Sequence, residues 1–310
     1  MTGTQWAPEV SVPPGLAAEL IGAQFPGLDT RQVTILETGW DNTACLVDGQ
    51  WLFRFPRREI ALPGVRREIA VLPRLAARLP LPIPVPEFVG QPSPRYPWPF
   101  WGARLLPGHE LAEAALADDE RRGAATSVGQ FLRALHEPSL VAIVDGDDLP
   151  ADPMRRASPP TRAVRAREVL DRLVSRGVIP ADRDLERLLD DAEQVAAGTG
   201  PGSLVVTHGD LHIRHLLVDD AGAATGVIDW GDLCLADPAV DLSIAYCGFA
   251  GRARADLLSA YGRPVGAERE LAARVCAISV IASLAEYAAD EGRSVLLGES
   301  VAGLRRAVAA

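Results

Sequence analysis

The stretch THGDLHIRHLLV at residues 207–218, followed by GVIDWGD at residues 226–232, decides the fold of this chain. It places two carboxylates, Asp210 and Asp229, directly after short apolar runs that predict strands. Residues 216–218 predict another strand, and DDAG after it predicts a hairpin turn. Because a strand–turn–strand unit brings its two ends together, we expect the loop that carries Asp210 to meet the loop that carries Asp229.

Two carboxylates in adjoining loops suit phosphoryl transfer. One can orient an attacking hydroxyl and accept its proton, while the other holds Mg²⁺ against nucleotide phosphates. Either aspartate alone could be a loop cap or a turn residue. The joint pattern favours catalysis, with Asp210 as the base or orienting group and Asp229 as a metal ligand.

The motifs HGD at 208–210, IDW at 228–230 and DPAVDL at 237–242 resemble those of aminoglycoside phosphotransferase-like kinases of small molecules, which are relatives of the protein kinases. The resemblance covers about residues 30–250. It implies Mg²⁺ as cofactor and ATP or GTP as co-substrate. It also implies that His208 supports the catalytic loop and that Asp241 fixes this loop from below.

The same resemblance implies a two-lobe, protein-kinase-like α+β fold. The N-lobe, residues 1–106, would consist of an antiparallel sheet plus a helix and would bind the nucleotide. The larger, mostly helical C-lobe, residues 107–310, would carry the catalytic loop and the acceptor site.

His215 departs from the family pattern, which usually has Asn there. Asn offers an oxygen, which Mg²⁺ prefers, whereas imidazole suits softer metals. The macrolide phosphotransferases tend to carry His at this position, so His215 can mark that subgroup. Two alternatives stay open: His215 binds the metal with Asp229, or it hydrogen-bonds Asp210 or a phosphate.

The N-lobe residues expected to contact the nucleotide follow from the resemblance. Strands are predicted at 32–37, 43–47 and 50–55, and a helix at 63–79. The turn between the first two strands would lie over the phosphates and comprises Gly39, Trp40, Asp41 and Asn42. The hinge that would hold the purine edge includes Leu105 and Leu106.

Arg54 stands where the fold expects a phosphate-binding lysine, and the chain contains no lysine. Arginine is always charged and can bind phosphate in a bidentate manner. Glu68 in the predicted helix would pair with Arg54. The alternative for both is an ordinary surface charge.

The net charge of −10 arises from residues 111–150 and 201–310, which each carry an excess of acids over arginines. Such a field attracts a cationic acceptor and argues against nucleic-acid binding. The alternative is charge that serves solubility alone. Asp232 and Asp237, which follow the metal loop, could face the acceptor.

Several features predict a cytoplasmic enzyme that does not span a membrane. No apolar run reaches membrane length, and the first residues lack the basic and apolar regions of a secretory signal. The four cysteines, Cys45, Cys234, Cys247 and Cys276, show neither metal-site nor disulfide spacing.

The predicted activity is transfer of the γ-phosphate of ATP or GTP to a hydroxyl of an antibiotic such as an aminoglycoside or a macrolide. Resistance by O-phosphorylation would follow. The alternatives are a housekeeping sugar or amino-alcohol kinase and a nucleotide-binding pseudokinase. The sequence does not name the acceptor.

Overall fold

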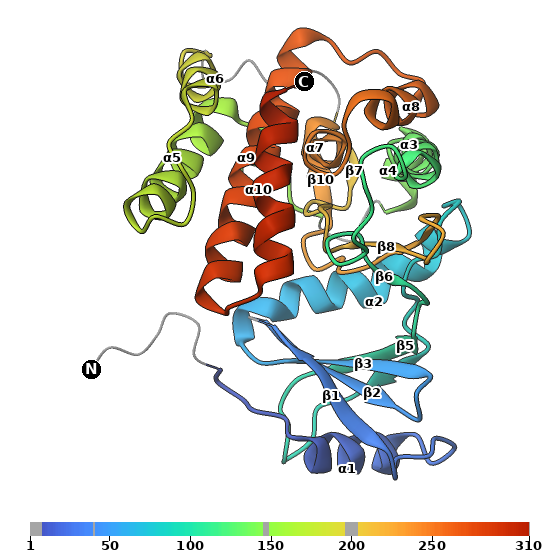
Figure 1. The fold of residues 1–310 in the computed structure, drawn as a ribbon. Helices are drawn as coiled ribbons and strands as arrows, with labels where there is room; N and C mark the ends of the chain where they lie inside the picture. The colour runs from blue at the N-terminus through green and yellow to red at the C-terminus, as the bar shows by residue number, and fades with distance from the viewer. Residues whose placement is uncertain (1–7, 40, 145–148, 196–203, 310) are drawn as a thin grey trace. The chain divides into compact units, whose positions relative to one another are not determined.

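A computed structural model describes residues 8–39, 41–144, 149–195 and 204–309. The described chain divides into two compact units (Figure 1). The first runs to Ala77 and includes Ile83–Leu106, and the second consists of Arg78–Pro82 and the residues from Pro107 onward.

The first unit contains a five-stranded antiparallel sheet with the strand order β1-β2-β3-β5-β4. The strands are β1 (Val33–Thr38), β2 (Asn42–Val47), β3 (Trp51–Pro56), β4 (Phe88–Gly90) and β5 (Phe100–Arg104). Asp48 and Gly49 join β2 to β3 with φ angles of 51° and 63°. Two adjacent left-handed residues are what a tight hairpin turn requires, which explains the Asp-Gly pair.

Aromatic side chains fill the core of this unit. Phe53, Phe55 and Phe100 are fully buried, and the rings of Phe53 and Phe55 both contact that of Phe100. Helix α1 (Pro14–Gln24) covers this core through Ala17, Leu20 and Ile21, and it was not predicted from the sequence. A 3₁₀ turn, η1 (Glu59–Ala61), leads into α2 (Leu62–Ala76), whose buried residues include Glu68.

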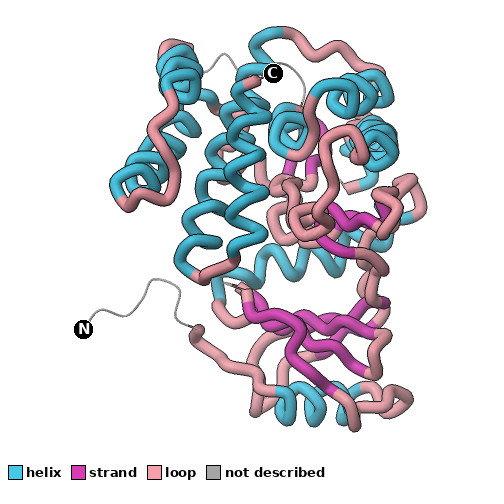
Figure 2. Tube along the Cα trace, viewed as in Figure 1, coloured by secondary structure: helices cyan, strands magenta, loops and turns pink. Residues whose placement is uncertain are grey.

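The second unit is mostly helical (Figure 2). Its helices are α3 (Arg122–Leu135), α4 (Ser139–Ile143), α5 (Pro159–Ser175), α6 (Arg183–Glu193), α7 (Ala239–Cys247), α8 (Gly251–Tyr261), α9 (Ala267–Asp290) and α10 (Ser294–Val308). Helix α9 packs against α5, α7 and α10, and α3 packs against α8. By length and composition α9 could cross a membrane, but most of its apolar window is buried, as in a core helix, so this is weak evidence for a span.

Short strands position the two aspartate loops. β8 (Leu216–Val218) pairs with β9 (Ala224–Val227) and with β6 (His109–Glu110), and β7 (Val205–Thr207) pairs with β10 (Cys234–Ala236). The side chain of Asp219 accepts hydrogen bonds from the main-chain N–H groups of Ala221 and Ala223, which closes the β8–β9 turn. The predicted hairpin between the two aspartates is therefore confirmed.

Candidate active site

The loop between β7 and β8 requires glycine at residue 209. Gly209 has a φ of 87°, in the left-handed region, and a Cβ atom there would lie 2.1 Å from the carbonyl oxygen of Asp232. The two aspartate loops thus meet at main-chain contact distance. Any side chain at residue 209 would push them apart.

Asp241, at the start of α7, holds this loop. Its buried carboxylate accepts hydrogen bonds from the N–H groups of His208 (2.8 Å) and Gly209 (3.0 Å). It also lies 3.2 Å from Nε2 of His136, whose Nδ1 lies 3.1 Å from the hydroxyl of Tyr261. His136 was not among the residues predicted for the site, because helical spacing cannot show a contact with a distant carboxylate.

His208 ties the loop of Asp210 to the loop of Asp229. Its Nε2 donates to the carbonyl of Ile228 at 2.9 Å, and its Nδ1 accepts from the N–H of Asp210 at 3.2 Å. The side chain is fully buried, and burial lowers its pKa, so the ring is neutral. A neutral ring with one donor and one acceptor satisfies both contacts.

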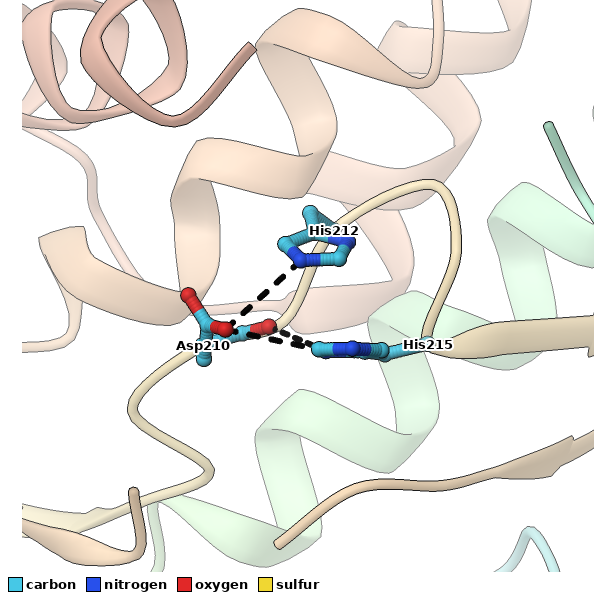
Figure 3. A group of neighbouring side chains, drawn as sticks. All are labelled: Asp210, His212 and His215. Atoms are coloured by element: carbon cyan, nitrogen blue, oxygen red, sulfur yellow. Dashed lines mark hydrogen bonds and ion pairs between the residues drawn. The ribbon is translucent and has the colours of Figure 1, made fainter. Parts of the chain in front are cut away.

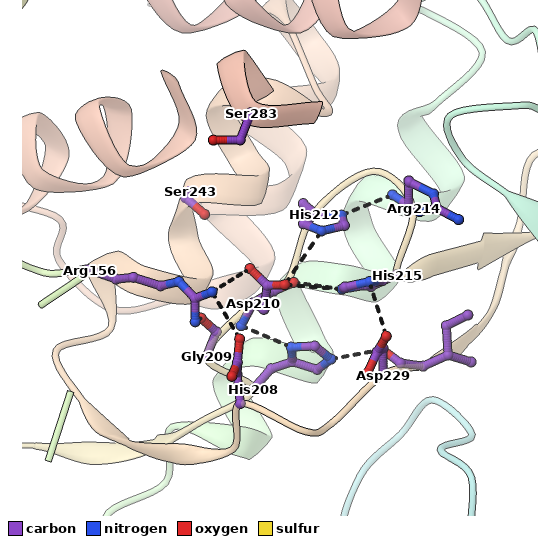
Figure 4. Close-up of polar contacts among 12 residues, drawn as sticks. Arg156, His208, Gly209, Asp210, His212, Arg214, His215, Asp229, Ser243 and Ser283 are labelled. Carbon is purple, nitrogen blue, oxygen red and sulfur yellow. Dashed lines mark hydrogen bonds and ion pairs between the residues drawn. The ribbon is translucent and has the colours of Figure 1, made fainter. Parts of the chain in front are cut away.

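Asp210 lies among three cationic or imidazole groups (Figures 3 and 4). Arg156 Nη2 is 3.0 Å from its Oδ1, and the Nε2 of His212 is 3.6 Å from its Oδ2. The rings of His212 and His215 stack with centroids 3.8 Å apart. Burial alone would raise the pKa of Asp210, but Arg156 and the imidazole of His212 outweigh it and hold this pKa well below its ordinary range. The carboxylate is therefore ionised.

Arg156 was not singled out from the sequence. The segment before α5 runs beside β10: the N–H of Asp152 donates to the carbonyl of Leu235, and the N–H of Leu235 donates to the carbonyl of Pro150. The Asp152 carboxylate accepts from the N–H groups of Arg156 and Ala157. The Arg156 guanidinium then reaches Asp210, Asp232 and the carbonyl of Gly209. No local periodicity marks this segment, so its position depends on tertiary contacts.

His215 and Asp229 fit a divalent cation. Nδ1 of His215 lies 2.8 Å from the main-chain oxygen of Asp210, and a carbonyl can only accept, so Nδ1 carries the proton. Nε2 keeps its lone pair and lies 3.6 Å from Oδ2 of Asp229. Two acceptors at that separation favour a cation between them. Burial also lowers the pKa of His215, which keeps the ring neutral as a metal ligand must be.

A second donor set overlaps the first. Asp210, His212 and His215 each offer one ligand atom, and these atoms lie within 4.8 Å of one another. A cation held there would occupy the Asp210 carboxylate, which an acceptor hydroxyl would need. A cation held by His215 and Asp229 instead leaves the Asp210 carboxylate free to bind that hydroxyl.

The two candidate acceptor residues differ. Asp232 is half exposed and pairs with Arg156 at 2.9 Å, beside Asp210. Asp237 is buried, and both of its carboxylate oxygens bind Arg269 at 3.0 Å. The geometry gives Asp237 a structural role at the start of α7, where it also accepts from the N–H of Ala239.

In the first unit, Arg54 on β3 pairs with Glu68 on α2. Nη1 of Arg54 lies 2.8 Å from Oε1 of Glu68, and Nε1 of Trp101 donates to Oε2 at 3.2 Å. Both charged side chains are almost buried. The pair therefore holds the helix against the sheet and fixes where the guanidinium lies.

The remaining nucleotide-contact candidates also lie in the first unit. In the turn before β2, Gly39 donates its N–H to the carbonyl of Asn42 at 3.0 Å, and Asp41 pairs with Arg58. Trp40 lies outside the described residues. Leu105 donates its N–H to the carbonyl of Gln50 at 2.8 Å, and Leu106 follows it as the last residue of the unit.

Comparisons with known proteins bear on the family and the fold of this chain. A profile of the phosphotransferase enzyme family, APH, matches residues 32–274. The uncharacterized protein YcbJ of Bacillus subtilis (strain 168) is 39% identical over 66 residues, which is 21% of this chain and 22% of that protein. The matched region thus spans about a fifth of the length of that relative.

Two solved structures resemble the whole fold. The GDP and kanamycin complex of APH(2″)-IIIa has a TM-score of 0.66 at 23% identity, covering 94% of this chain and 97% of that chain. The apoenzyme of macrolide 2′-phosphotransferase MphH from Brachybacterium faecium has a TM-score of 0.58 at 24% identity, with coverages of 94% and 97%. These likenesses confirm the protein-kinase-like α+β fold. Since the family profile covers most of the chain, including both aspartate loops, the chain belongs to the phosphotransferase enzyme family.

Proposed function

We propose that this phosphotransferase transfers the γ-phosphate of ATP or GTP to a hydroxyl of a small molecule. The observation that carries the proposal is the meeting of Asp210 with His215 and Asp229 on two loops joined by His208. Asp210 supplies an ionised carboxylate for the hydroxyl, and His215 with Asp229 supplies a divalent-cation site. That division of roles is what phosphoryl transfer needs.

In the proposed reaction the acceptor hydroxyl donates a hydrogen bond to Asp210. Its oxygen bonds to the γ-phosphorus while the bond to the β-phosphate oxygen breaks, so the nucleoside diphosphate leaves. The hydroxyl proton passes to the Asp210 carboxylate and then to solvent. Because Arg156 keeps the pKa of Asp210 low, this carboxylate is a weak base and acts mainly by orienting the hydroxyl.

His215 and Asp229 would hold Mg²⁺, which neutralises phosphate charge when it is bound. Arg54, held by Glu68, would contact a phosphate, and the turn at residues 39–42 would cover the phosphates. Main-chain groups of Leu105 and Leu106 would bind the purine edge. In this proposal the first unit binds the nucleotide, and the second carries catalysis and the acceptor site.

Antibiotics are the first acceptors to test, and resistance by O-phosphorylation would follow. The solved relative with kanamycin and GDP and the macrolide 2′-phosphotransferase support this choice. We place the enzyme in the cytoplasm, in keeping with the four buried free cysteines. The proposal includes no nucleic-acid or membrane partner.

A positive charge on the acceptor is a separate part of the proposal. It follows from the acidic excess, although many of these acids pair with arginines, as Asp256 does with Arg122 and Glu286 with Arg172. Screening by salt provides the test. A KM for the acceptor that rises between low and moderate salt at constant kcat supports it, and a flat KM contradicts it.

The deciding experiment is a panel of aminoglycosides, macrolides, sugars and amino alcohols assayed for Mg²⁺-dependent release of ADP or GDP. Turnover with an antibiotic supports the first proposal. Turnover confined to sugars or amino alcohols favours a housekeeping kinase. Nucleotide binding without any turnover favours a pseudokinase.

A further inference from the structure

His212 contacts both the candidate base and a candidate metal ligand (Figure 3). Its Nε2 lies 3.6 Å from Oδ2 of Asp210, and its ring stacks on that of His215 with an angle of 29° between the planes. The side chain is buried, with an exposed fraction of 5%. Because a buried imidazole needs a partner for each ring nitrogen, its neighbours determine which nitrogen carries the proton.

The main chain of the same loop sets the tautomer of His212. The N–H of Arg214 donates to Nδ1 of His212 at 3.2 Å. Nδ1 must therefore keep its lone pair, so the proton of the ring is on Nε2. The Nε2–H group then faces the Asp210 carboxylate, whose ionised oxygens can only accept.

Arg214 is itself held in place by an ion pair with β6. Its Nε and Nη2 bind the two carboxylate oxygens of Glu110, each at 2.9 Å. Both side chains are largely buried, and a bidentate pair of this kind fixes the orientation of the arginine. The main-chain N–H of Arg214 is therefore kept on the side of His212.

The same tautomer argues against a cation shared by Asp210, His212 and His215. These residues are close enough to hold an ion, but a metal binds the lone pair of an imidazole, and that of His212 faces the N–H of Arg214. In His215 the proton is on Nδ1, and Nε2 keeps its lone pair on the side of Asp229. The two stacked rings therefore have opposite tautomers, one suited to donate to a carboxylate and the other to bind a metal.

The two oxygens of Asp210 have different neighbours (Figure 4). Oδ1 lies 3.0 Å from Nη2 of Arg156, whereas Oδ2 faces Nε2 of His212. A carboxylate held at both oxygens cannot turn about its Cβ–Cγ bond. Each oxygen accepts more than one hydrogen bond, so Oδ2 can still accept from a hydroxyl. A carboxylate oriented in advance needs no reorganisation when the hydroxyl reacts.

We propose that His212 is a positioning residue for phosphoryl transfer. Its Nε2–H donates to Oδ2 of Asp210 and, together with Arg156, holds the carboxylate in the orientation that receives the acceptor hydroxyl. This rests on the proposed function, because Asp210 is the group that meets the hydroxyl. The separation of 3.6 Å is longer than a hydrogen bond, as catalytic contacts often are before substrates bind, and we expect it to shorten in the substrate complex.

The first test reads the tautomers directly and needs neither nucleotide nor turnover. Nitrogen NMR of the imidazole rings distinguishes the two neutral tautomers, and the wild type is used, so the result does not depend on the folding of a variant. We expect the proton on Nε2 in His212 and on Nδ1 in His215. A His212 ring with an unprotonated Nε2 would overturn the proposal, because that nitrogen could only accept a hydrogen bond or bind a metal.

The second test separates the two contacts of His212 with two amide side chains. In His212→Asn the amide oxygen can take the place of Nδ1 and accept from Arg214, but the side chain is too short to reach Asp210. In His212→Gln the amide nitrogen can take the place of Nε2 and donate to Asp210, while the acceptor for Arg214 is lost. Both variants lose the ring that stacks on His215, so this loss cancels when the two are compared.

His212→Asn should lower kcat about 10-fold, as for loss of a hydrogen bond to a charged group, while the KM of the nucleotide stays constant. His212→Gln should recover most of this loss. The matched control is His109→Asn, which should keep the wild-type kcat, because His109 faces Asp220 at 3.3 Å but is exposed and far from Asp210 in the chain.

A role of His212 in holding the loop alone predicts the reverse order, with His212→Asn active and His212→Gln impaired. That order, or equal losses of kcat in the two variants, would overturn the proposal. Failure of the kinase proposal looks different: no acceptor gives release of ADP or GDP, while the NMR spectrum still shows the proton of His212 on Nε2.

Discussion

Nη2 of Arg156 lies 3.0 Å from Oδ1 of Asp210 and 2.9 Å from Oδ2 of Asp232, so one guanidinium joins the candidate base to a second carboxylate. The contact fixes the Asp210 side chain and keeps it ionised. It also leaves the other oxygen of Asp210 on the side of His212 and His215. Arg156 therefore acts as a positioning residue for Asp210.

Replacing Arg156 by Gln should lower kcat about 10- to 100-fold, the loss expected when a charged hydrogen bond is removed. The KM of the nucleotide should stay constant. Arg156→Lys should restore part of the loss, and low concentrations of guanidinium should restore part of it in Arg156→Ala. Asp232→Asn is the control, because it keeps the contact to Asp210. Equal losses in Arg156→Gln and Asp232→Asn would contradict a specific role for the contact.

Asp210→Asn should keep the fold and nucleotide binding and lose turnover by about 10²- to 10⁴-fold, because the amide can no longer orient the hydroxyl as a carboxylate does or accept its proton. The side chains have nearly the same shape, so the loop should stay in place. Steady-state turnover and nucleotide calorimetry on the same preparation provide the measurement. Turnover within threefold of the wild type would exclude Asp210 as the base or orienting group.

Asp229→Ala should abolish the Mg²⁺ dependence of nucleotide affinity, because it removes the carboxylate that faces Nε2 of His215. His215→Asn should keep activity with Mg²⁺, since Asn offers a hard oxygen, and His215→Ala should lose it. Turnover is measured against Mg²⁺ and Mn²⁺ concentration. If the metal profile is the same in the wild type, His215→Asn and His215→Ala, then His215 does not bind the metal.

The buried thiols should make stability fall at high pH. Burial raises the pKa of Cys45 and of Cys247 to about 12. In unfolded chains a thiol has a pKa of about 8.5. Because the pKa of each thiol is higher in the folded protein than in the unfolded chain, folding is favoured while the thiol stays protonated. The thiol's contribution to the free energy of unfolding is therefore fully present below the pKa of the unfolded chain and is lost between about pH 9 and 12. Each thiol should lower the unfolding free energy by about 1.4 kcal/mol per pH unit in that window.

Urea unfolding of the wild type, Cys45→Ala and Cys247→Ala at pH 8, 9 and 10 measures this effect. The proteins are compared by the slope of unfolding free energy against pH. Absolute values would not serve, because each substitution also leaves a cavity and because the tyrosines of the unfolded chain ionise in the same pH range. Each variant should show a smaller decline with pH than the wild type. Equal slopes in all three proteins would mean that these thiols ionise equally in both states.

The sequence predicted the parts of the site that depend on local order. The hairpin between Asp210 and Asp229 follows from alternating apolar runs and a turn, and β8 and β9 pair as expected. The first three strands of the N-terminal sheet also begin and end within one residue of the predicted positions. The pairing of Arg54 with Glu68 was expected from the family resemblance and is present.

Long-range contacts could not be predicted in this way. Arg156 and His136 reach the site from segments far from residues 207–232, and no spacing rule connects them. β10 is a three-residue strand in a stretch that reads as a loop, and α8 and α10 have weak apolar periodicity. Asp237 shows the converse: its sequence position suggested an acceptor contact, whereas its carboxylate is engaged by Arg269.

Arg54, held by Glu68, also determines how this protein can be detected in a mixture. Reagents that label nucleotide sites by acylating a nearby lysine need an unprotonated amine, whereas the guanidinium of Arg54 stays charged and unreactive. The chain contains no lysine anywhere. Proteome surveys that rely on lysine acylation will therefore pass over this protein, and arginine-directed dicarbonyl reagents are the suitable alternative.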